Sequence, residues 1–127
     1  MNIDTLVRKN IKNMSSYSSA RDDFKKENDK KLIYLDANES PFDNGINRYP
    51  DNKHTELKKV VSDIKNVNIN QVIFGNGTDE ILDLIVRVFC KPSEDKIITL
   101  PPTYGMYDII AKTKGVENIE IPLKSDF

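Results

Sequence analysis

The chain has few of the residues that form disulfides or bind metal ions. It contains one cysteine, Cys90, and one histidine, His54. A single cysteine excludes an internal disulfide and a cysteine-rich zinc site, and a lone histidine has no second histidine with which to share a metal. No metal site is therefore expected. Cys90 lies on an apolar stripe, which favours packing over reactive chemistry, and His54 is expected at a solvated helix start.

Long apolar runs and an excess of charge are also lacking. No run approaches the ~20 apolar residues of a membrane span, and the start of the chain, MNIDTLVRKN, lacks the apolar core of a signal peptide. The formal net charge is -1 over 127 residues. This balance gives no reason to expect a nucleic-acid or membrane partner. We expect a cytoplasmic protein of one domain, or part of a larger one.

The chain divides near residue 54 into an irregular part and a regular part. In residues 1–54 we expect a short amphipathic helix over Ile3–Ile11, then a charged, solvated segment at residues 22–31. An extended arm with turns should follow over residues 32–52, because asparagine, aspartate, glycine and proline interrupt its short apolar run.

Residues 55–127 alternate between helix and strand patterns. Apolar residues at i, i+3, i+4 and i+7 predict a helix over residues 57–64 and another over residues 81–89. Short β-branched runs predict strands, and a third helix closes at Gly115. The expected strands are 72–74, 96–100 and 118–123, and the third helix is 103–114. This alternation predicts an α/β layered fold with a largely parallel sheet.

The predicted topology brings two turns together. If the strands are parallel, the segments after Phe74 and Leu100 leave the sheet at the same edge, where open α/β sheets bind their ligands. GNGTDE and PPTYGMY are therefore expected to be neighbours across one crevice, although they lie far apart in the sequence.

The turn GNGTDE can be interpreted in two ways. Its glycines allow close approach of the backbone, and the amides that open a helix favour an anion, so Gly77, Thr78 and Asp79 suit a phosphate. The alternative is a simple turn with acidic residues that complement the helix dipole. If an anion binds, both carboxylates should point away from it. The lysine-containing phosphate loop and the dinucleotide glycine fingerprint are absent.

Two other segments carry candidate residues. In LPPTYGMYDII, Thr103 can cap the helix, and Tyr104 in its first turn either offers its ring to a flat ligand or packs in the core. In NRYPD, Asn47, Arg48 and Tyr49 either contact a ligand or partner chain or belong to a plain surface loop.

Five motifs together resemble one family. YLDANESP, NRYPD, GNGTDEILDLIVRVFC, PPTYGMYDIIA and IPLKSDF, in this order and at these spacings, are similar to the N-terminal part of histidinol-phosphate aminotransferases. These are fold-type I enzymes that use pyridoxal 5'-phosphate (PLP). The resemblance covers Tyr17 to the last residue. It implies a three-layer α/β fold with a mainly parallel sheet, the N-terminal portion of the PLP-binding large domain (55–127), preceded by the arm (1–54).

The resemblance also implies roles for cofactor-binding residues. Gly77, Thr78 and Asp79 match the loop whose amides hold the cofactor phosphate, and Tyr104 matches the aromatic residue stacked on the pyridine ring. Tyr49 matches a tyrosine that reaches the cofactor phosphate of the neighbouring subunit, so a homodimer is implied.

For the substrate, the resemblance implies three further residues. Tyr17 matches a tyrosine near the substrate phosphate. Asn38 and Glu39 match the arm that lines the substrate entrance and contacts the partner subunit, and their individual roles stay open. The implied substrates are histidinol phosphate and 2-oxoglutarate, converted to imidazole-acetol phosphate and glutamate in histidine biosynthesis.

One family feature has no match in this sequence. None of its lysines stands in the context of the lysine that binds PLP covalently, so we expect no catalytic residue here and no turnover by this chain alone. Two alternatives stay open at this stage. One is a threonine-phosphate decarboxylase or another small PLP aminotransferase, and the other is a non-catalytic assembly module.

Overall fold

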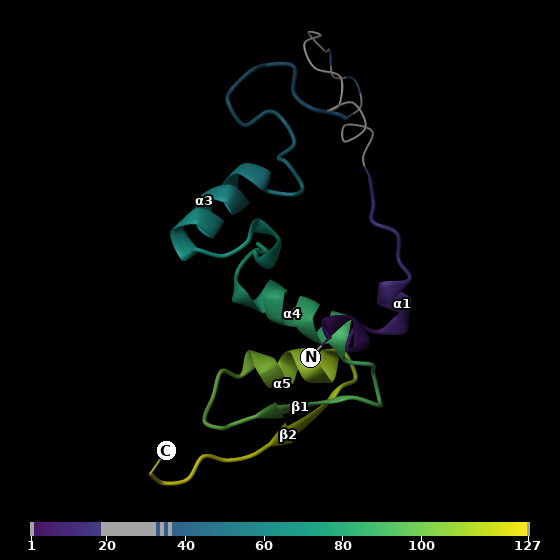
Figure 1. The fold of residues 1–127 in the computed structure, drawn as a ribbon, viewed down its shortest axis with the longest axis vertical. Coiled ribbons are helices and arrows are strands. Elements are labelled where there is room, and N and C mark those ends of the chain that lie inside the picture. Colours follow the sequence, from purple (N-terminus) through teal and green to yellow (C-terminus); the bar gives the residue numbers. More distant parts are fainter. Residues whose placement is uncertain (1, 19–32, 34, 36, 127) are drawn as a thin grey trace. The chain divides into compact units, whose positions relative to one another are not determined.

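The computed structural model describes residues 2–18, 33, 35 and 37–126. The expected charged segment at residues 22–31 lies outside the described residues. The chain forms two compact units, Met1–Met14 with Phe74–Phe127, and Ser15–Ile73. Figure 1 shows the first unit with helices α4 and α5 and strands β1 and β2, and the second with helix α3. Each unit is described by itself.

Helix α4, Thr78–Phe89, confirms the second predicted helix. Its core residues are Val86 and, packed against it, Leu82. The apolar stripe at positions 81, 84, 85 and 88 that predicted the helix does not supply them, and Ile85 in that stripe is 48% exposed. Acidic residues stand in the first turn of α4 and Arg87 in its last, as the helix dipole favours.

Helix α5, Met106–Thr113, begins later than predicted. Thr103 does not cap it, because the N-cap is Gly105 and no side chain bonds to the first turn. Two consecutive prolines, Pro101 and Pro102, carry the chain away from the sheet first. Tyr104 consequently lies in the loop before the helix and not in its first turn. The helix end is as predicted, with Gly115 in the left-handed region at φ 66°.

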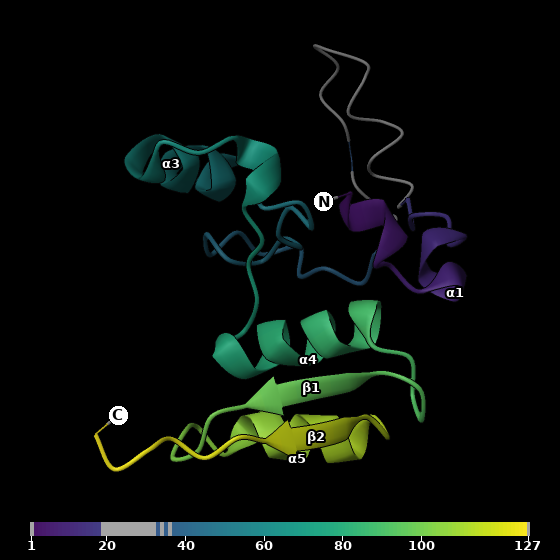
Figure 2. The same cartoon turned by 60° about the horizontal axis from the view of Figure 1, so that its bottom comes forward.

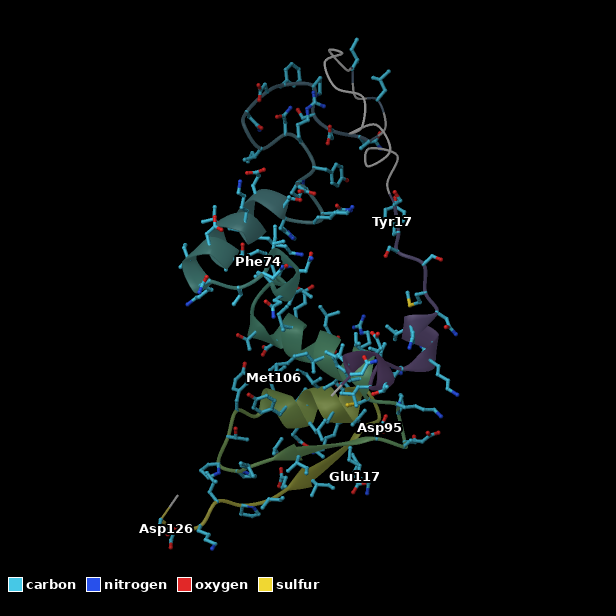
Figure 3. The ribbon with its side chains drawn as sticks, viewed as in Figure 1. Tyr17, Phe74, Asp95, Met106, Glu117 and Asp126 are labelled. Atoms are coloured by element: carbon cyan, nitrogen blue, oxygen red, sulfur yellow. The ribbon has the colours of Figure 1, made fainter. Side chains whose placement is uncertain are left out.

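The described sheet has two parallel strands, β1 (Lys96–Thr99) and β2 (Glu117–Glu120), joined through α5. Ile98 pairs with Ile119, and the Lys96 ammonium lies 2.9 Å from the carboxylate of Glu117, which is labelled in Figure 3. Two of the three predicted strands are thus confirmed, and the fold is α/β with a small parallel sheet.

The predicted strand at residues 72–74 is wrong for this structure. Val72 is extended, but residues 72–74 form no strand and belong to no part of the β1–β2 sheet. A short β-branched run is a local pattern, whereas a strand also requires a partner strand that this pattern does not specify.

Both helices cover one side of the sheet, as Figures 1 and 2 show from two directions. The core between helices and sheet is small; it consists of Val86, Ile110, Ala111 and Val116, with Leu82, Cys90, Ile97 and Met106 packed against it. Burial raises the pKa of the Cys90 thiol, with the nearby Asp95 carboxylate adding to it. This is the packing role predicted for Cys90. On the opposite side of the sheet Ile98 is 63% exposed.

The N-terminal residues contact the end of α4. A short 3-10 helix, Ile3–Thr5, and a short helix α1, Lys9–Lys12, replace the single predicted helix. The break is at Arg8, whose backbone is extended. Its N–H donates to the Val88 carbonyl at 3.1 Å and its guanidinium to the Arg87 carbonyl at 2.8 Å. Arg8 thereby satisfies carbonyls that a helix C-terminus leaves unpaired.

The second unit contains helix α3, Thr55–Lys65, which confirms the first predicted helix, and a 3-10 turn, Ile69–Gln71. His54 is its N-cap and is exposed, as predicted. From residue 37 to residue 53 the described chain forms turns and extended segments without helix or strand. No helix in the described part of the chain is long and apolar enough to cross a membrane.

Candidate functional site

The turn before α4 is held closed by its own backbone and by Glu80. The Gly77 N–H donates to the Gly75 carbonyl at 3.0 Å, and the Asn76 N–H donates to the Glu80 carboxylate. A Cβ at Gly75 would lie 2.7 Å from Ile81 Cδ1, so a larger residue there would displace the packed side chain. Gly77 has φ 83° and ψ 171°, a region essentially restricted to glycine.

The first turn of α4 leaves its amides open. No side chain caps the helix, and the first amides of any helix have no partner within it. Beside Gly77, a Cβ would meet nothing within 4 Å. Open amides next to free space, at the positive end of a helix dipole, suit an anionic oxygen. The first turn of α4 thus offers backbone donors to an anion.

Tyr104 and Asp79 bring the two predicted neighbours together. The Tyr104 hydroxyl donates to Asp79, 3.0 Å from Oδ1 and 3.3 Å from Oδ2. The prediction that GNGTDE and PPTYGMY lie side by side is therefore confirmed. Asp79 thus directs its carboxylate to Tyr104, and Glu80 directs its carboxylate to Asn76.

The ring of Tyr104 is available to a ligand. It is 53% exposed, which rules out the alternative of a core residue, and the Tyr104 and Tyr107 rings are perpendicular, with centroids 6.0 Å apart at 87°. Met106, by contrast, packs against the core. The hydrogen bond to Asp79 raises the pKa of Tyr104, so the phenol keeps its proton well into alkaline solution.

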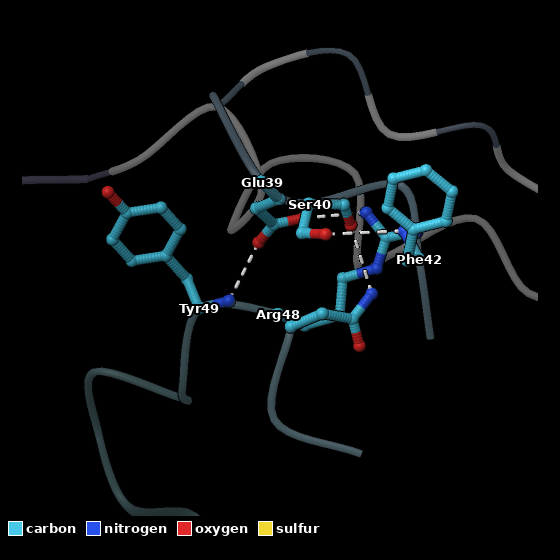
Figure 4. A network of polar contacts seen from close by, with 6 residues as sticks. Glu39, Ser40, Phe42, Arg48 and Tyr49 are labelled. Atoms are coloured by element: carbon cyan, nitrogen blue, oxygen red, sulfur yellow. Dashed lines mark hydrogen bonds and ion pairs between the residues drawn. The ribbon is translucent and has the colours of Figure 1, made fainter. Parts of the chain in front are cut away.

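In the second unit, Glu39 and Tyr49 are brought together (Figure 4). Glu39 Oε1 accepts from the Tyr49 N–H at 2.7 Å, and Oε2 accepts from the Arg48 guanidinium at 2.8 Å. The Glu39 side chain is only 3% exposed. The phenol of Tyr49 points away from this network and is 67% exposed. The loop between them is therefore ordered around a buried carboxylate.

The other predicted substrate residues have no such partner network. Asn38 is exposed beside Glu39, and Tyr17, labelled in Figure 3, is exposed in an extended segment. Their predicted roles stay predictions. Among the described residues, no three histidine, cysteine, aspartate or glutamate side chains gather as metal ligands would.

The sequence interpretation missed two partners. It did not foresee that Asp79 accepts from Tyr104, because a hydrogen bond between residues far apart leaves no local pattern. It also left the role of Glu39 open. A signal was present in the turn-forming stretch DNG between Glu39 and Tyr49, since such a turn can reverse the chain and bring its two flanks together.

Comparison with known proteins identifies the family of this chain. Residues 23–127 match the model of the family "Aminotransferase class I and II". The chain belongs to this aminotransferase family. Its members are generally PLP-dependent enzymes. The described part of this chain has the α/β fold with a small parallel sheet.

Several relatives share the name histidinol-phosphate aminotransferase. The relative from Flavobacterium psychrophilum is 53% identical over 126 residues, which cover 99% of this chain and 36% of the relative. The one from Flavobacterium johnsoniae is 50% identical over 125 residues, covering 98% and 36%. The one from Bacteroides thetaiotaomicron is 42% identical over 125 residues, covering 98% and 36%. The chain thus spans about a third of their length.

Proposed function

We propose that this chain is the N-terminal section of a cytoplasmic, PLP-dependent histidinol-phosphate aminotransferase. The longer enzyme would interconvert histidinol phosphate plus 2-oxoglutarate with imidazole-acetol phosphate plus glutamate, in histidine biosynthesis. The observation that carries the proposal is the juxtaposition of the open first turn of α4 with the exposed Tyr104 ring, through Asp79. The name of the relatives, histidinol-phosphate aminotransferase, supports the assignment of histidinol phosphate as substrate.

The residues present fit PLP. Its phosphate would be held by the loop Gly77, Thr78 and Asp79: the backbone amides of Thr78 and Asp79 would donate, and Gly77, whose N–H donates to the Gly75 carbonyl, would let the backbone approach closely. Its ring would stack on Tyr104, an aromatic residue that is 53% exposed. When bound, PLP supplies an electrophilic carbon and an electron sink. The role of these residues is to bind and orient it, while Asp79 and Glu80 keep their carboxylates on partners other than the phosphate.

In the whole enzyme, we propose a three-layer fold in which the arm extends to a second subunit. Tyr49 would donate its phenol to the cofactor phosphate of that subunit, which makes the site a property of a homodimer. Tyr17 and Asn38 would face the substrate. The exposure of the Tyr49 and Tyr17 phenols is compatible with contacts outside this chain.

The test of this function is complementation followed by direct binding. The full reading frame that contains this chain should restore growth without histidine to a host that lacks histidinol-phosphate aminotransferase, and the purified product should bind PLP. Restored threonine-phosphate decarboxylation without histidine prototrophy would identify the other small PLP enzyme instead. Failure to bind PLP at all would overturn the proposal.

A second measurement addresses the 127-residue chain by itself. With PLP and borohydride, we expect no lysine of this chain to be labelled preferentially, and no transamination. Labelling of one specific lysine, or turnover, would show that this section carries a catalytic amine and that its assignment to binding alone is wrong.

A further inference from the structure

We infer that Glu39 is a positioning residue, which holds the arm so that Tyr49 is presented to the cofactor phosphate. This inference rests on the proposed function for the role of Tyr49. The geometry that points to it is independent of any ligand. One carboxylate bonds both to the backbone of Tyr49 and to the side chain of the residue before it.

The Glu39 carboxylate is the centre of the arm. At 3% exposure it has lost almost all contact with water, and a buried carboxylate is tolerated only where donors replace that water. Arg48 supplies a charged donor at 2.8 Å, and the Tyr49 N–H supplies a second at 2.7 Å. Charge-assisted bonds of this length are the stronger class of hydrogen bond.

The loop between Glu39 and Tyr49 closes on itself through further bonds. The Asn47 amide donates to the Ser40 carbonyl at 3.1 Å, so the two flanks of the loop are joined at a second level. At the tip, Asp43 accepts from the Gly45 N–H at 3.1 Å, which forms a local turn. Residues 40–48 are therefore a closed loop with its ends fixed at Glu39.

The consequence falls on Tyr49. Its backbone is tied to Glu39, while its ring projects away from the network (Figure 4). A phenol that must reach an anion gains little if its backbone is free to move, because ordering it on binding costs conformational entropy. Glu39 removes this cost in advance. The proline that follows, Pro50, restricts the backbone of Tyr49 further.

The inference can be tested in the full-length enzyme by the affinity of the apo form for PLP. Glu39→Ala removes both acceptors and should weaken PLP binding about tenfold, whereas Glu39→Gln, whose amide oxygen can still accept from Tyr49, should weaken it about threefold. The matched control is Asp43→Asn, which removes a carboxylate from the same loop but keeps an oxygen for Gly45. It should stay within about twofold of the parent.

A double-mutant cycle separates positioning from general stability. Tyr49→Phe should itself weaken PLP binding about tenfold, and adding Glu39→Ala should then cost less than about twofold more. Hydrogen exchange of the Tyr49 amide in the apo enzyme should accelerate in Glu39→Ala and not in Asp43→Asn. A merely structural role would weaken binding equally in both backgrounds.

The outcomes distinguish this inference from the proposed function. Suppose that the enzyme binds PLP and that Tyr49→Phe weakens this binding. If the Glu39 variants then leave the PLP affinity unchanged, or if their effect on it multiplies with that of Tyr49→Phe, Glu39 is not the positioning residue. Unchanged exchange at the Tyr49 amide in Glu39→Ala would overturn it equally. If Tyr49→Phe leaves the affinity unchanged, the role of Tyr49 in the proposed function fails and the positioning role with it. An enzyme that binds no PLP overturns both.

Discussion

The hydroxyl of Tyr104 donates to the carboxylate of Asp79 across 3.0 Å, and this bond joins the loop after β1 to the first turn of α4. As a result, the backbone amide and the carboxylate of Asp79 have different roles. The Asp79 amide stays in the open helix start, where an anion is favoured, and its carboxylate is directed to a phenol. The repulsion expected between an acidic first turn and a phosphate is thereby reduced, because the negative side chain is turned to a donor.

The first prediction concerns the ionisation of Tyr104. Because the bond to Asp79 raises its pKa above the ordinary 10.0, Tyr104 should ionise later than a free tyrosine. In Asp79→Asn the charge is gone, and ionisation should move back toward 10.0. The tyrosinate absorbance of the enzyme, taken as the difference from its Tyr104→Phe variant, measures this. Glu80→Gln is the matched control, since Glu80 bonds to Asn76 and should leave the Tyr104 titration elevated.

The same shift fixes the sign of a stability effect. The folded protein holds the Tyr104 proton more tightly than the unfolded chain, so the contribution of this bond is complete below the unfolded pKa of 10.0 and is lost as pH rises through the higher folded value. Tyr104→Phe should therefore lose its stability difference from the parent only in strongly alkaline solution. A difference that disappeared in acid instead would contradict this assignment.

The second prediction concerns two glycines that border the site. Gly77 and Gly105 both have open space where a Cβ would stand, so sterics at that atom do not separate them. Their backbones do. Gly77→Ala must hold alanine at φ 83° and ψ 171°, which should cost about 1–3 kcal/mol of unfolding free energy and weaken PLP binding.

Gly105→Ala is the control for that substitution. Gly105 has φ -65° and ψ -19°, which any residue adopts, so alanine should change the stability by less than about 1 kcal/mol, in the stabilising direction. Urea denaturation and PLP titration of both variants give the comparison. Equal behaviour of the two would mean that the turn at Gly77 does not require its left-handed conformation.

How far the sequence predicts this structure depends on the range of the interactions involved. Helix α4 could be predicted because the spacing of its apolar residues 81, 84, 85 and 88 is a local pattern, although its core residues are Leu82 and Val86. The proximity of the GNGTDE and PPTYGMY segments was predicted too, but not the bond from Tyr104 to Asp79. The strand predicted at residues 72–74 is not formed, because strand formation depends on a partner strand and not on the local pattern alone. The late start of α5, at Met106, was not predicted although Pro101 and Pro102 stand close before it.

The arm illustrates the same limit in a different way. Turn-forming residues predict that the chain reverses between Glu39 and Tyr49, but they do not say which side chain will be enclosed. The identity of the enclosed group follows from charge and geometry together, since Arg48 and the Tyr49 amide face one carboxylate. The burial of a glutamate in a polar loop can be recognised only when the positions of its hydrogen-bond donors are known.

The third prediction concerns the ion pairs of Asp83. Its carboxylate lies 2.7 Å from the Lys114 ammonium and 2.5 Å from the Arg87 guanidinium, which ties α4 to the end of α5. These partners, Lys114 first, lower the pKa of Asp83 below 3.8. Asp83→Asn should cost about 1 kcal/mol of unfolding free energy near neutral pH.

The pH dependence of that loss has a definite direction. Because the folded pKa is depressed, the contribution is present above the unfolded value of 3.8 and is lost as pH falls through the folded value. The gap between parent and Asp83→Asn should thus close in acid. Glu94→Gln, which removes an exposed pair with Lys91, is the control and should change stability by less than about 0.5 kcal/mol. A gap that persisted unchanged at low pH would refute the pairing.

The fourth prediction concerns the uncovered side of the sheet. Ile98 is 63% exposed beside Ile119, whereas Ile97 on the other side packs against the core. If the remainder of a longer enzyme covers this side, Ile98→Thr should destabilise that enzyme by about 1.5–3 kcal/mol. The same substitution should cost the isolated 127-residue chain almost nothing and reduce its association, since it removes an exposed apolar residue. Ile97→Thr should destabilise both proteins. Thermal unfolding and light scattering of the 127-residue chain and of the full-length product measure these effects. A sharp cooperative melt of the monomeric chain, together with an Ile98→Thr substitution that destabilises neither protein, would mean that nothing packs on this side of the sheet.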